Sequence, residues 1–391
     1  MRKIALQGST GSIGLSALEV VRSCPEKFQI VSLMAGKNVD LLAEQVREFK
    51  PAVVSLEGEE EAERLKSLVG PGPWEILWGE EGILAGTLHD EVDTVLAGAS
   101  GVSCLRANLE AVKRGKRVGI ANKELLVAAG ELFVSEAKKS GALLIPVDSE
   151  HSAIFQALAG HDRGGVRRIV LTASGGPFHG RDVDFSSVTV EDALSHPVWK
   201  MGKKITVDSA TMMNKGYELI EASRLFEVSP ERVDVLIHPQ SIVHSMVEFV
   251  DGSLIAHLGV PDMKIPIAFA LSFPERVELC RTLSLPEDLN GLEFSLPRYD
   301  KFPSVPLARE VAMKGGLLPS VLVGANDRLV EHFLEGRVAF SDIYSLTERA
   351  VREMEGKASQ PVTLEGVEET ISEAVSLIDR IVSGMERSRR V

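Results

Sequence analysis

Two carboxylates, a hydroxyl and an imidazole follow an apolar segment in the stretch PVDSEHSAIF, residues 146–155. Residues 142–147 have the composition of a buried strand. If strand geometry continues beyond them, Asp148 and Glu150 point the same way, because side chains two positions apart on a strand share a face. Two such carboxylates repel each other unless a cation lies between them. The spacing therefore predicts a cation-binding position at the end of a strand.

A second polar stretch, VDSATMMNKGYELIEA at residues 207–222, supplies further oxygen and nitrogen groups. Ser209, Asn214 and Lys215 together suit a phosphate monoester, because they offer hydrogen-bond donors and one positive charge. Glu218 could add a third carboxylate to the first pair, and three carboxylates without thiolates favour Mg²⁺ or Mn²⁺ over zinc. Taken one at a time, these residues also suit a capped, solvated helix, which is the preferred interpretation of Glu221.

Three further segments carry polar groups after predicted strands or in loops. The stretch SGGPF, residues 174–178, places Ser174 beside two glycines whose N–H groups can bind an anion. The stretch LSHPVWKMGKKI, residues 194–205, predicts a mobile flap in which Trp199 closes over a ligand; a surface loop held by one buried tryptophan is the alternative. Lys123 follows another predicted strand, where ligands of open α/β sheets bind, although a solvated lysine is equally typical there.

The first turn of the chain, GSTGSIG at residues 8–14, indicates a binding site for a nucleotide pyrophosphate. Its three glycines permit a tight turn and a close backbone approach, and the next helix offers its N-terminal N–H groups; a plain glycine turn is the alternative. The second strand ends in AGKN, residues 35–38, where NAD-binding proteins usually place a carboxylate. Lys37 can instead neutralise a 2′-phosphate, which favours NADPH, unless it merely begins a solvated helix.

Strand-like and helix-like segments alternate over the first 150 residues, which predicts a doubly wound parallel sheet. After residue 150 the pattern becomes α+β, with a hairpin around Asp251-Gly252 and a C-terminal helix capped by Thr363. The predicted strands of the first part are 3–7, 28–35, 52–56, 94–99, 117–121 and 142–147, its helices include 39–49 and 125–138, and later strands are 168–173 and 233–238.

Composition and charge exclude several classes of protein. A length of 391 residues predicts two or three domains. The composition, with 44% hydrophobic and 25% charged residues, is typical of globular proteins. The net charge of −13 argues against general binding to nucleic acid or acidic membrane surfaces. No apolar run reaches the roughly 18 residues of a membrane span, and no signal peptide is expected. Three cysteines without metal-type or disulfide-type spacing predict a reduced, cytoplasmic protein.

A series of motifs along most of the chain resembles the 1-deoxy-D-xylulose 5-phosphate reductoisomerase family: GSTGSIG, AGKN, ANKE, VDSEH, SGGPF, HPVWKMG, DSATMMNKG.E, HPQSIVHSMVEF and PDMKIPIA. The resemblance implies an α/β chain with a Rossmann-like NADPH-binding domain (1–148), an α+β catalytic domain with a flap (149–273), a linker (274–305) and a C-terminal helical domain (306–391). It also implies a homodimer that acts on a phosphorylated ketose. Gln7 departs from the family, which more often has a smaller residue before the first glycine.

The same resemblance implies the site residues and the reaction, in which a skeletal rearrangement precedes hydride transfer from NADPH. Asp148, Glu150 and Glu218 would hold Mg²⁺ or Mn²⁺, with Co²⁺ as a further candidate, and the chemistry would fall to Lys123, Glu150 and His196. The substrate would contact Ser149, Glu150, Ser174, His196, Trp199, Ser209, Asn214, Lys215 and Glu218. The cofactor would contact Gly8, Ser9, Thr10, Gly11, Ser12, Ile13, Gly36, Lys37, Asn38, Ala99, Asn122, Lys123, Glu124, Gly202 and Met263.

Two other classes of function stay open from the residues alone. A metal-free oxidoreductase on the same cofactor domain would need a nucleophilic cysteine, for which Cys104 is the candidate. The second class is a regulator that binds NADPH without catalysis. Such a protein would not need three converging carboxylates or a segment whose backbone N–H groups bind phosphate.

Overall fold

A computed structural model describes residues 1–199, 201–279, 283 and 287–389, and the chain divides into two compact units. The first unit comprises Met1–Leu125, Phe133–Ser152 and Asp262–Thr282, and the second comprises Leu126–Leu132, Ala153–Pro261 and Leu283–Val391. The division into three domains and a linker stays a prediction.

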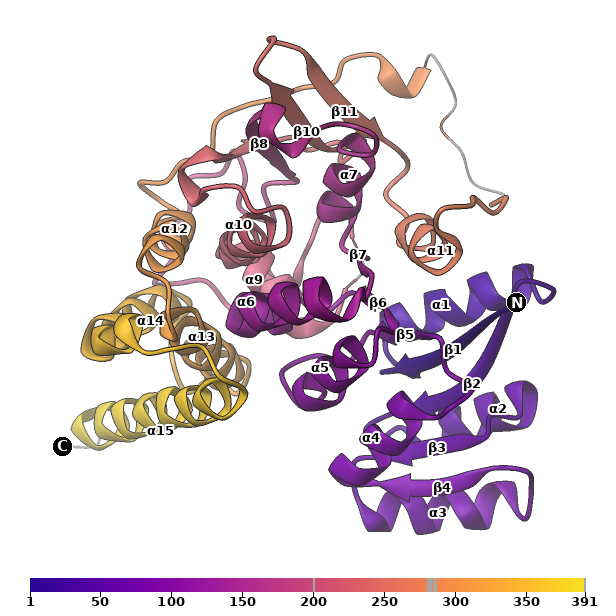
Figure 1. The fold of residues 1–391 in the computed structure, drawn as a ribbon. Coiled ribbons are helices and arrows are strands. Elements are labelled where there is room, and N and C mark those ends of the chain that lie inside the picture. The colour runs from indigo at the N-terminus through magenta and orange to yellow at the C-terminus, as the bar shows by residue number, and fades with distance from the viewer. Residues whose placement is uncertain (200, 280–282, 284–286, 390–391) are drawn as a thin grey trace. The chain divides into compact units, whose positions relative to one another are not determined.

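The first unit is built on a seven-stranded, entirely parallel sheet with the order β4-β3-β2-β1-β5-β6-β7. Central strands such as β3 and β5 are buried along their whole length, as expected for a parallel sheet covered by helices on both faces (Figure 1). The strands are β1 Arg2–Gln7, β2 Phe28–Met34, β3 Val53–Leu56, β4 Glu75–Trp78, β5 Thr94–Ala97, β6 Arg117–Ile120 and β7 Leu144–Pro146.

The strand order reverses between β1 and β5, so the connections leave the sheet in opposite directions at this point and open a crevice at the strands' carboxyl ends. The loop after β1 and the residues after β5 therefore share one edge of the sheet. The helices of this part are α1 Ser12–Ser23, α2 Val39–Phe49, α3 Glu59–Val69, α4 Gly79–Leu88, α5 Leu105–Lys113, α6 Lys123–Ser140 and α11 Lys264–Ser272.

Two expectations for this sheet are wrong. The edge strand β4 is not predicted by the sequence, because it has only four residues and alternates weakly, with its ends Glu75 and Trp78 exposed. Strand geometry also does not continue to Glu150: β7 ends at Pro146, and α7 (Ser149–Ala157) begins three residues later. Asp148 and Glu150 are therefore brought near each other by a helix start and not by a strand.

The second unit contains a four-stranded mixed sheet with the order β11-β10-β8-β9. β8 (Val166–Ala173) pairs in parallel with β9 (Val233–Ile237) and antiparallel with β10 (Val243–Phe249). β10 continues into β11 (Leu254–Leu258) through the predicted turn, where Gly252 has φ +87° and the Phe249 N–H donates to the Ser253 carbonyl. The predicted hairpin is thus confirmed.

The helices of this unit include α8 Val190–Leu194, α9 Lys203–Ala210 and α10 Met213–Leu225, and the C-terminal helices α12 Ser304–Lys314, α13 Leu318–Leu334, α14 Phe340–Glu353 and α15 Leu364–Arg389 (Figure 1). The long helix α13 packs against both α14 and α15. Thr363 caps α15 as predicted, since its hydroxyl accepts the Gly366 N–H at 3.0 Å. Short 3₁₀ turns occur at Arg163–Gly165, Pro230–Arg232, Glu287–Leu289 and Glu355–Ser359.

No helix in the described ranges is both long enough and apolar enough to cross a membrane. Within the same ranges Cys24 and Cys104 are buried free thiols, whereas Cys280 lies outside the described residues.

Candidate active site

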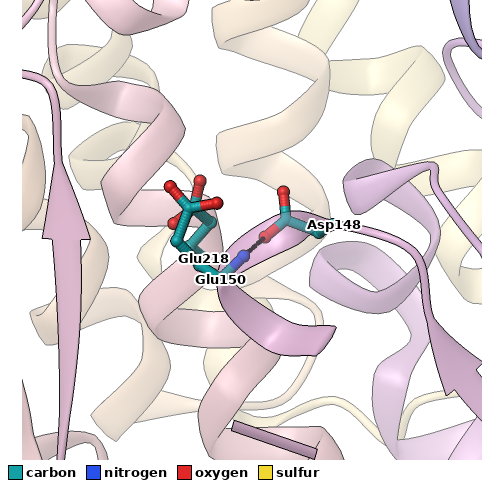
Figure 2. Close-up of side chains that lie close together, drawn as sticks. All are labelled: Asp148, Glu150 and Glu218. Atoms are coloured by element: carbon teal, nitrogen blue, oxygen red, sulfur yellow. Dashed lines mark hydrogen bonds between the residues drawn. The ribbon is translucent and has the colours of Figure 1, made fainter. Parts of the chain in front are cut away.

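Three carboxylates that are distant in sequence approach one another. Asp148 follows β7, Glu150 lies in the first turn of α7 and Glu218 lies in α10, and each offers one oxygen within 4.8 Å of the other two (Figure 2). Asp148 and Glu218 are buried, and Glu150 is half-buried. Oxygens bound to one Mg²⁺ at about 2.1 Å lie roughly 3–4 Å apart, so a small contraction would let these three share an ion. This donor set fits a hard divalent cation.

Asp148 has two sets of partners. Its Oδ1 accepts the backbone N–H groups of Glu150 at 3.1 Å and His151 at 3.3 Å, which makes Asp148 the cap of α7 (Figure 2). Its Oδ2 forms an ion pair with Lys123, and the buried His151 Nδ1 lies 3.2 Å from Oδ1. Lys123 is the first residue of α6, so the predicted polar residues after β6 and β7 meet at this carboxylate.

Glu218 is held by two of the residues predicted to bind phosphate. Asn214 donates its side-chain N–H to Oε1 at 2.6 Å, and Lys215 pairs with Oε2 at 2.5 Å. These residues lie on one face of α10, three and four positions apart. Glu218 is only 1% exposed, and these donors compensate the hydration that a charged carboxylate loses on burial.

The residue that begins this helix has an uncommon backbone conformation. Met212 precedes α10 with φ +60° and ψ 11°, in the left-handed region that costs an L-residue about 1 kcal/mol or more. Its carbonyl accepts the N–H groups of Lys215 and Gly216 at 3.1 Å. This turn aims the start of α10, and with it Asn214 and Lys215.

Ser174 and His196 are joined, and the hydrogen bonds of His196 indicate its tautomer. His196 Nδ1 accepts the backbone N–H of Trp199 at 2.9 Å and of Val198 at 3.2 Å, so its proton lies on Nε2. Nε2–H therefore donates to Ser174 Oγ at 3.1 Å. Burial, and secondarily the charge of Lys215, lower the pKa of His196, which keeps the imidazole neutral at pH 7.

The two glycines after Ser174 form the predicted turn against α9. Gly175 and Gly176 both have positive φ, +89° and +66°. A Cβ on Gly176 would lie 2.8 Å from the carbonyl oxygen of Ser209, so the turn and α9 are in direct contact. Ser174 thus contacts His196, and the backbone of Ser209 lies against the adjacent turn; the shared role of the three residues stays a prediction. The flap residues Trp199 and Met201 are half-buried in irregular chain, and Gly202 precedes α9.

The loop after β1 has the geometry of a pyrophosphate cradle. Gly8 has φ +73°, and a Cβ there would lie 2.7 Å from the Gly98 carbonyl oxygen, so only glycine fits. Gly11 precedes α1 and provides no side chain to cap it. Within the described part of the chain, the hydroxyl of buried Ser9 has no hydrogen-bond partner. Open helix N–H groups and an unused hydroxyl fit an anionic ligand such as the NADPH pyrophosphate.

The remaining predicted cofactor residues divide into exposed groups and helix caps. Lys37 is mostly exposed and lies 3.8 Å from Glu57, while Asn38 caps α2 by accepting the Leu41 N–H. Asn122 caps α6 and donates to the carbonyls of Ala99 and Gly101, which ties the ends of β5 and β6 together. Glu124 is buried in the first turn of α6, and Met263 precedes α11. Thr10 lies in the loop after β1, and Ser12 and Ile13 are the first two residues of α1.

Sequence reasoning missed a buried amide network behind this loop. Gln7 is fully buried and its side-chain amide donates to Thr87 Oγ1 at 3.0 Å, while the Asn108 side-chain amide donates to Gln7 Oε1 at 2.9 Å. The network links β1 to α4 and α5 directly before Gly8. The only sign of this network in the sequence was a polar residue, Gln7, inside an apolar strand.

Cys104 does not have the properties of a nucleophile. It is buried at the N-terminal end of α5, and burial raises the pKa of its thiol, an effect that a hydrogen bond with Ser103 reduces. A thiol of raised pKa is inert at neutral pH. The metal-free alternative that depends on this cysteine is therefore disfavoured.

Comparisons with known proteins give one consistent result. Three family models match: "1-deoxy-D-xylulose 5-phosphate reductoisomerase" at residues 4–130, its C-terminal domain at 144–226 and "DXP reductoisomerase C-terminal domain" at 258–377. Relatives with the first of these names include one from Pelodictyon phaeoclathratiforme, 48% identical over 93% of this chain and 95% of its own. Another, from Symbiobacterium thermophilum, is 49% identical over 88% of this chain and 89% of its own.

Solved structures agree in fold over almost the entire chain. A DOX-P reductoisomerase in complex with NADPH, fosmidomycin and magnesium has a TM-score of 0.94 and 37% identity, covering 99% of both chains. The Zymomonas mobilis enzyme in complex with NADPH has a TM-score of 0.90 and 37% identity, covering 97% of this chain and 99% of its own.

Proposed function

Because the chain belongs to the 1-deoxy-D-xylulose 5-phosphate reductoisomerase family, we propose that it converts 1-deoxy-D-xylulose 5-phosphate into 2-C-methyl-D-erythritol 4-phosphate. This is an NADPH-dependent oxidoreductase reaction of non-mevalonate isoprenoid biosynthesis that also needs a divalent metal. The observation that carries the proposal is the approach of Asp148, Glu150 and Glu218 to within 4.8 Å in a chain that matches the family along its length.

The metal and the cofactor each supply one kind of chemistry. Asp148, Glu150 and Glu218 would hold a divalent cation, which would supply Lewis-acid chemistry for the skeletal rearrangement. Residues 8–13 with Gly36, Lys37 and Asn38 would hold NADPH, which would supply a hydride. Mg²⁺ and Mn²⁺ suit the all-oxygen donor set, and Co²⁺ is a further candidate.

The side chains near Asp148 control charge and orientation. Lys123, paired with Asp148, holds a positive charge beside the carboxylates and fixes the rotamer of one of them. The hydroxyl of Ser149 donates to Glu150, which orients the half-buried member of the three. Both residues thereby preorganise oxygens that would otherwise repel one another.

The phosphate of the substrate is the proposed ligand of Ser174, Ser209, Asn214 and Lys215. Neutral His196 donates its Nε2 proton to Ser174 Oγ, which leaves the hydroxyl hydrogen of Ser174 available for a phosphate oxygen. Binding energy from this remote group positions the reacting end of the substrate. Closure of the flap with Trp199 and Met201 would exclude water from the ligand.

A homodimer and a cytoplasmic location complete the proposal. The edge strand β11 exposes Leu254 and Leu258, and the adjoining hairpin exposes Val250. An apolar edge strand of this kind favours pairing with a second copy. Buried free thiols at Cys24 and Cys104 favour a reducing compartment. The proposed domains are 1–148 for the cofactor and 149–273 for catalysis, with a linker to 305 and a helical domain to 391.

The test uses Glu218→Gln, which keeps the size of the side chain and removes one negative charge. We expect kcat/KM for NADPH oxidation with 1-deoxy-D-xylulose 5-phosphate and Mg²⁺ to fall more than about 100-fold, because loss of an outer-sphere group alone costs 10–100-fold. Calorimetric titration should show weaker Mn²⁺ binding. The control is Glu231→Gln, the same change at an exposed position. Full activity of Glu218→Gln with Mg²⁺ would refute the role of Glu218, and NADPH oxidation by the unaltered protein that persists in excess chelator would refute the metal assignment.

A further inference from the structure

Buried charges that the proposed reaction does not use connect α9 to the C-terminal helix α13. Asp208 of α9 is 2% exposed. Its Oδ2 pairs with Lys204 at 2.8 Å, and its Oδ1 accepts the side-chain N–H of Asn326 from α13 at 2.8 Å. Lys204 also pairs with Asp327 of α13 at 2.9 Å and lies 4.9 Å from the ring centre of Tyr217.

The partners of Asp208 restrict how α9 can turn about its axis. Lys204 and Asp208 are one helical turn apart and share a face, so both of their bonds to α13 act on the same side of α9. A buried carboxylate that loses a partner is strongly destabilised, which penalises any rotation that separates Asp208 from Asn326. The network therefore fixes α9 in one orientation.

That orientation determines the position of the phosphate groups. Ser209 follows Asp208 and lies about 100° further round the helix, because an α-helix has 3.6 residues per turn. Its carbonyl oxygen contacts the Gly176 turn beside Ser174. At the other end of α9, Lys204 is two residues after Gly202, where the flap segment ends. Fixing the side of α9 that contacts α13 thus sets the orientation of Ser209 and the position of the residue at which the flap segment ends.

We propose that Asn326, Lys204 and Asp208 are positioning residues for substrate phosphate, acting through Ser209. This inference rests on the proposed phosphate-binding role of Ser174, Ser209, Asn214 and Lys215. Through Asn326, the C-terminal helix α13 then contributes to phosphate binding although it does not contact the phosphate.

The experiment compares Asn326→Leu, which keeps the volume but removes the amide, with the unaltered protein. We expect kcat/KM for 1-deoxy-D-xylulose 5-phosphate to fall about 10- to 100-fold, the cost of displacing a positioned group by up to 1 Å. The kcat/KM for 1-deoxy-D-xylulose, which lacks phosphate, should change less than about twofold, because the affected binding energy belongs to the phosphate alone. Asn326→Ser keeps a donor of shorter reach and provides a milder variant if Asn326→Leu does not fold.

Asp379→Asn is the matched control, since Asp379 of α15 pairs with Arg328 and His332 of the same helix α13. It should lower the Tm and leave the ratio of the two kcat/KM values unchanged. An equal loss on both substrates in the Asn326 variants, or no loss, would overturn the inference.

The affinity for inorganic phosphate, measured by ³¹P NMR, separates this inference from the proposed function. We expect the Asn326 variants to bind inorganic phosphate more weakly than the unaltered protein, whether or not the ketose phosphate is turned over. An unaltered protein that fails to oxidise NADPH with the ketose phosphate refutes the proposed function alone. Unchanged phosphate affinity in both Asn326 variants refutes the positioning role alone.

Discussion

The acidic residues of the candidate metal site already have basic or amide partners. Asp148 pairs with Lys123, and Glu218 pairs with Lys215 and Asn214. Three carboxylates beside two lysines leave one net negative charge if all five groups are ionised. This negative charge attracts a dication, and it is small enough that the site without a dication has little uncompensated charge. The same arrangement means that Lys215 must divide its interaction between Glu218 and the proposed phosphate.

His196 provides a direct measure of the environment at the proposed phosphate site. Because burial and Lys215 lower its pKa, its ¹⁵N-detected NMR titration should have a midpoint below the ordinary value of 6.5. Addition of inorganic phosphate should move the midpoint upward, since a nearby anion favours the charged imidazolium. The spectrum at pH 7 should also show the neutral ring with its proton on Nε2.

The Ser174→Ala variant serves as the reference for that titration, because it removes the acceptor of the Nε2 proton. A midpoint for the unaltered protein at or above 6.5 without phosphate, or the Nδ1–H tautomer, would contradict the geometry described for His196.

Among the helices and strands, the sequence predicted those with strong periodicity and missed those whose ends depend on other parts of the chain. The helix Val39–Phe49 and the hairpin at Gly252 have the predicted positions, since local caps and turn residues determine them. The short strand β4 was missed because its pairing with β3 is not visible in four residues. The capping role of Asp148 was missed because the same carboxylate also suited a metal.

The turn after β1 can be tested by adding one methyl group. Gly8→Ala and Gly70→Ala both place alanine at a positive φ, near +70°, at a cost of about 1–3 kcal/mol in unfolding free energy. Only Gly8→Ala also brings a Cβ within 2.7 Å of Gly98, whereas Gly70 has no atom within 4 Å. We therefore expect a large increase in the KM for NADPH for Gly8→Ala alone.

Steady-state kinetics and urea denaturation separate these effects. If Gly70→Ala raised the KM for NADPH as much as Gly8→Ala did, the close approach of Gly8 to Gly98 would have no specific role in cofactor binding.

The contact between α13 and α15 contains a second charge network, which is half-buried. Burial of Asp379 opposes its ionisation, but hydrogen bonds from Arg328 at 2.7 Å and from fully buried His332 at 2.7 Å outweigh burial and lower the pKa of this carboxyl. The stabilisation is complete above the ordinary pKa of 3.8 and disappears as the pH falls through the lowered value. Asp379→Asn should therefore lower the unfolding free energy at pH 7 by about 1 kcal/mol, a figure reduced for the partial exposure of Asp379.

Urea denaturation at pH 7 and at successive pH values below 3.8 provides the measurement. The difference between the two proteins should shrink as the pH falls, because Asp379 is protonated first in the unfolded chain and then in the folded protein. A difference that stayed constant across these pH values would show that the charge of Asp379 does not contribute.

For the complete chain, the sequence motifs were sufficient to predict the family, and the family models and relatives confirm that prediction. The positions of Asn326 and Asp327 against Lys204 and Asp208 could not be predicted, because more than 100 residues separate the partners and no short motif links them. Periodicity identifies helices that bury one face, but not which buried polar groups meet across that face.

The proposed assembly predicts a mass in solution of twice 42.3 kDa, measurable by light scattering after size-exclusion chromatography. Leu254→Glu places a charge on the exposed edge strand β11 and should shift the mass to that of one chain. Leu68→Glu makes the same change on α3 and should leave the mass unchanged. The two positions have similar exposure, 40% for Leu68 and 54% for Leu254. A single-chain mass for the unaltered protein would refute the dimer.

The left-handed backbone of Met212 has a consequence for laboratory evolution. Replacement by glycine would relieve that conformation, which costs about 1–2 kcal/mol, but it would also remove a side chain that is only 3% exposed, and truncation of a core methionine costs about 2–5 kcal/mol. Because the loss is larger than the gain, Met212→Gly should lower the Tm. Selection for heat resistance should therefore retain a large apolar residue at position 212 despite its left-handed backbone.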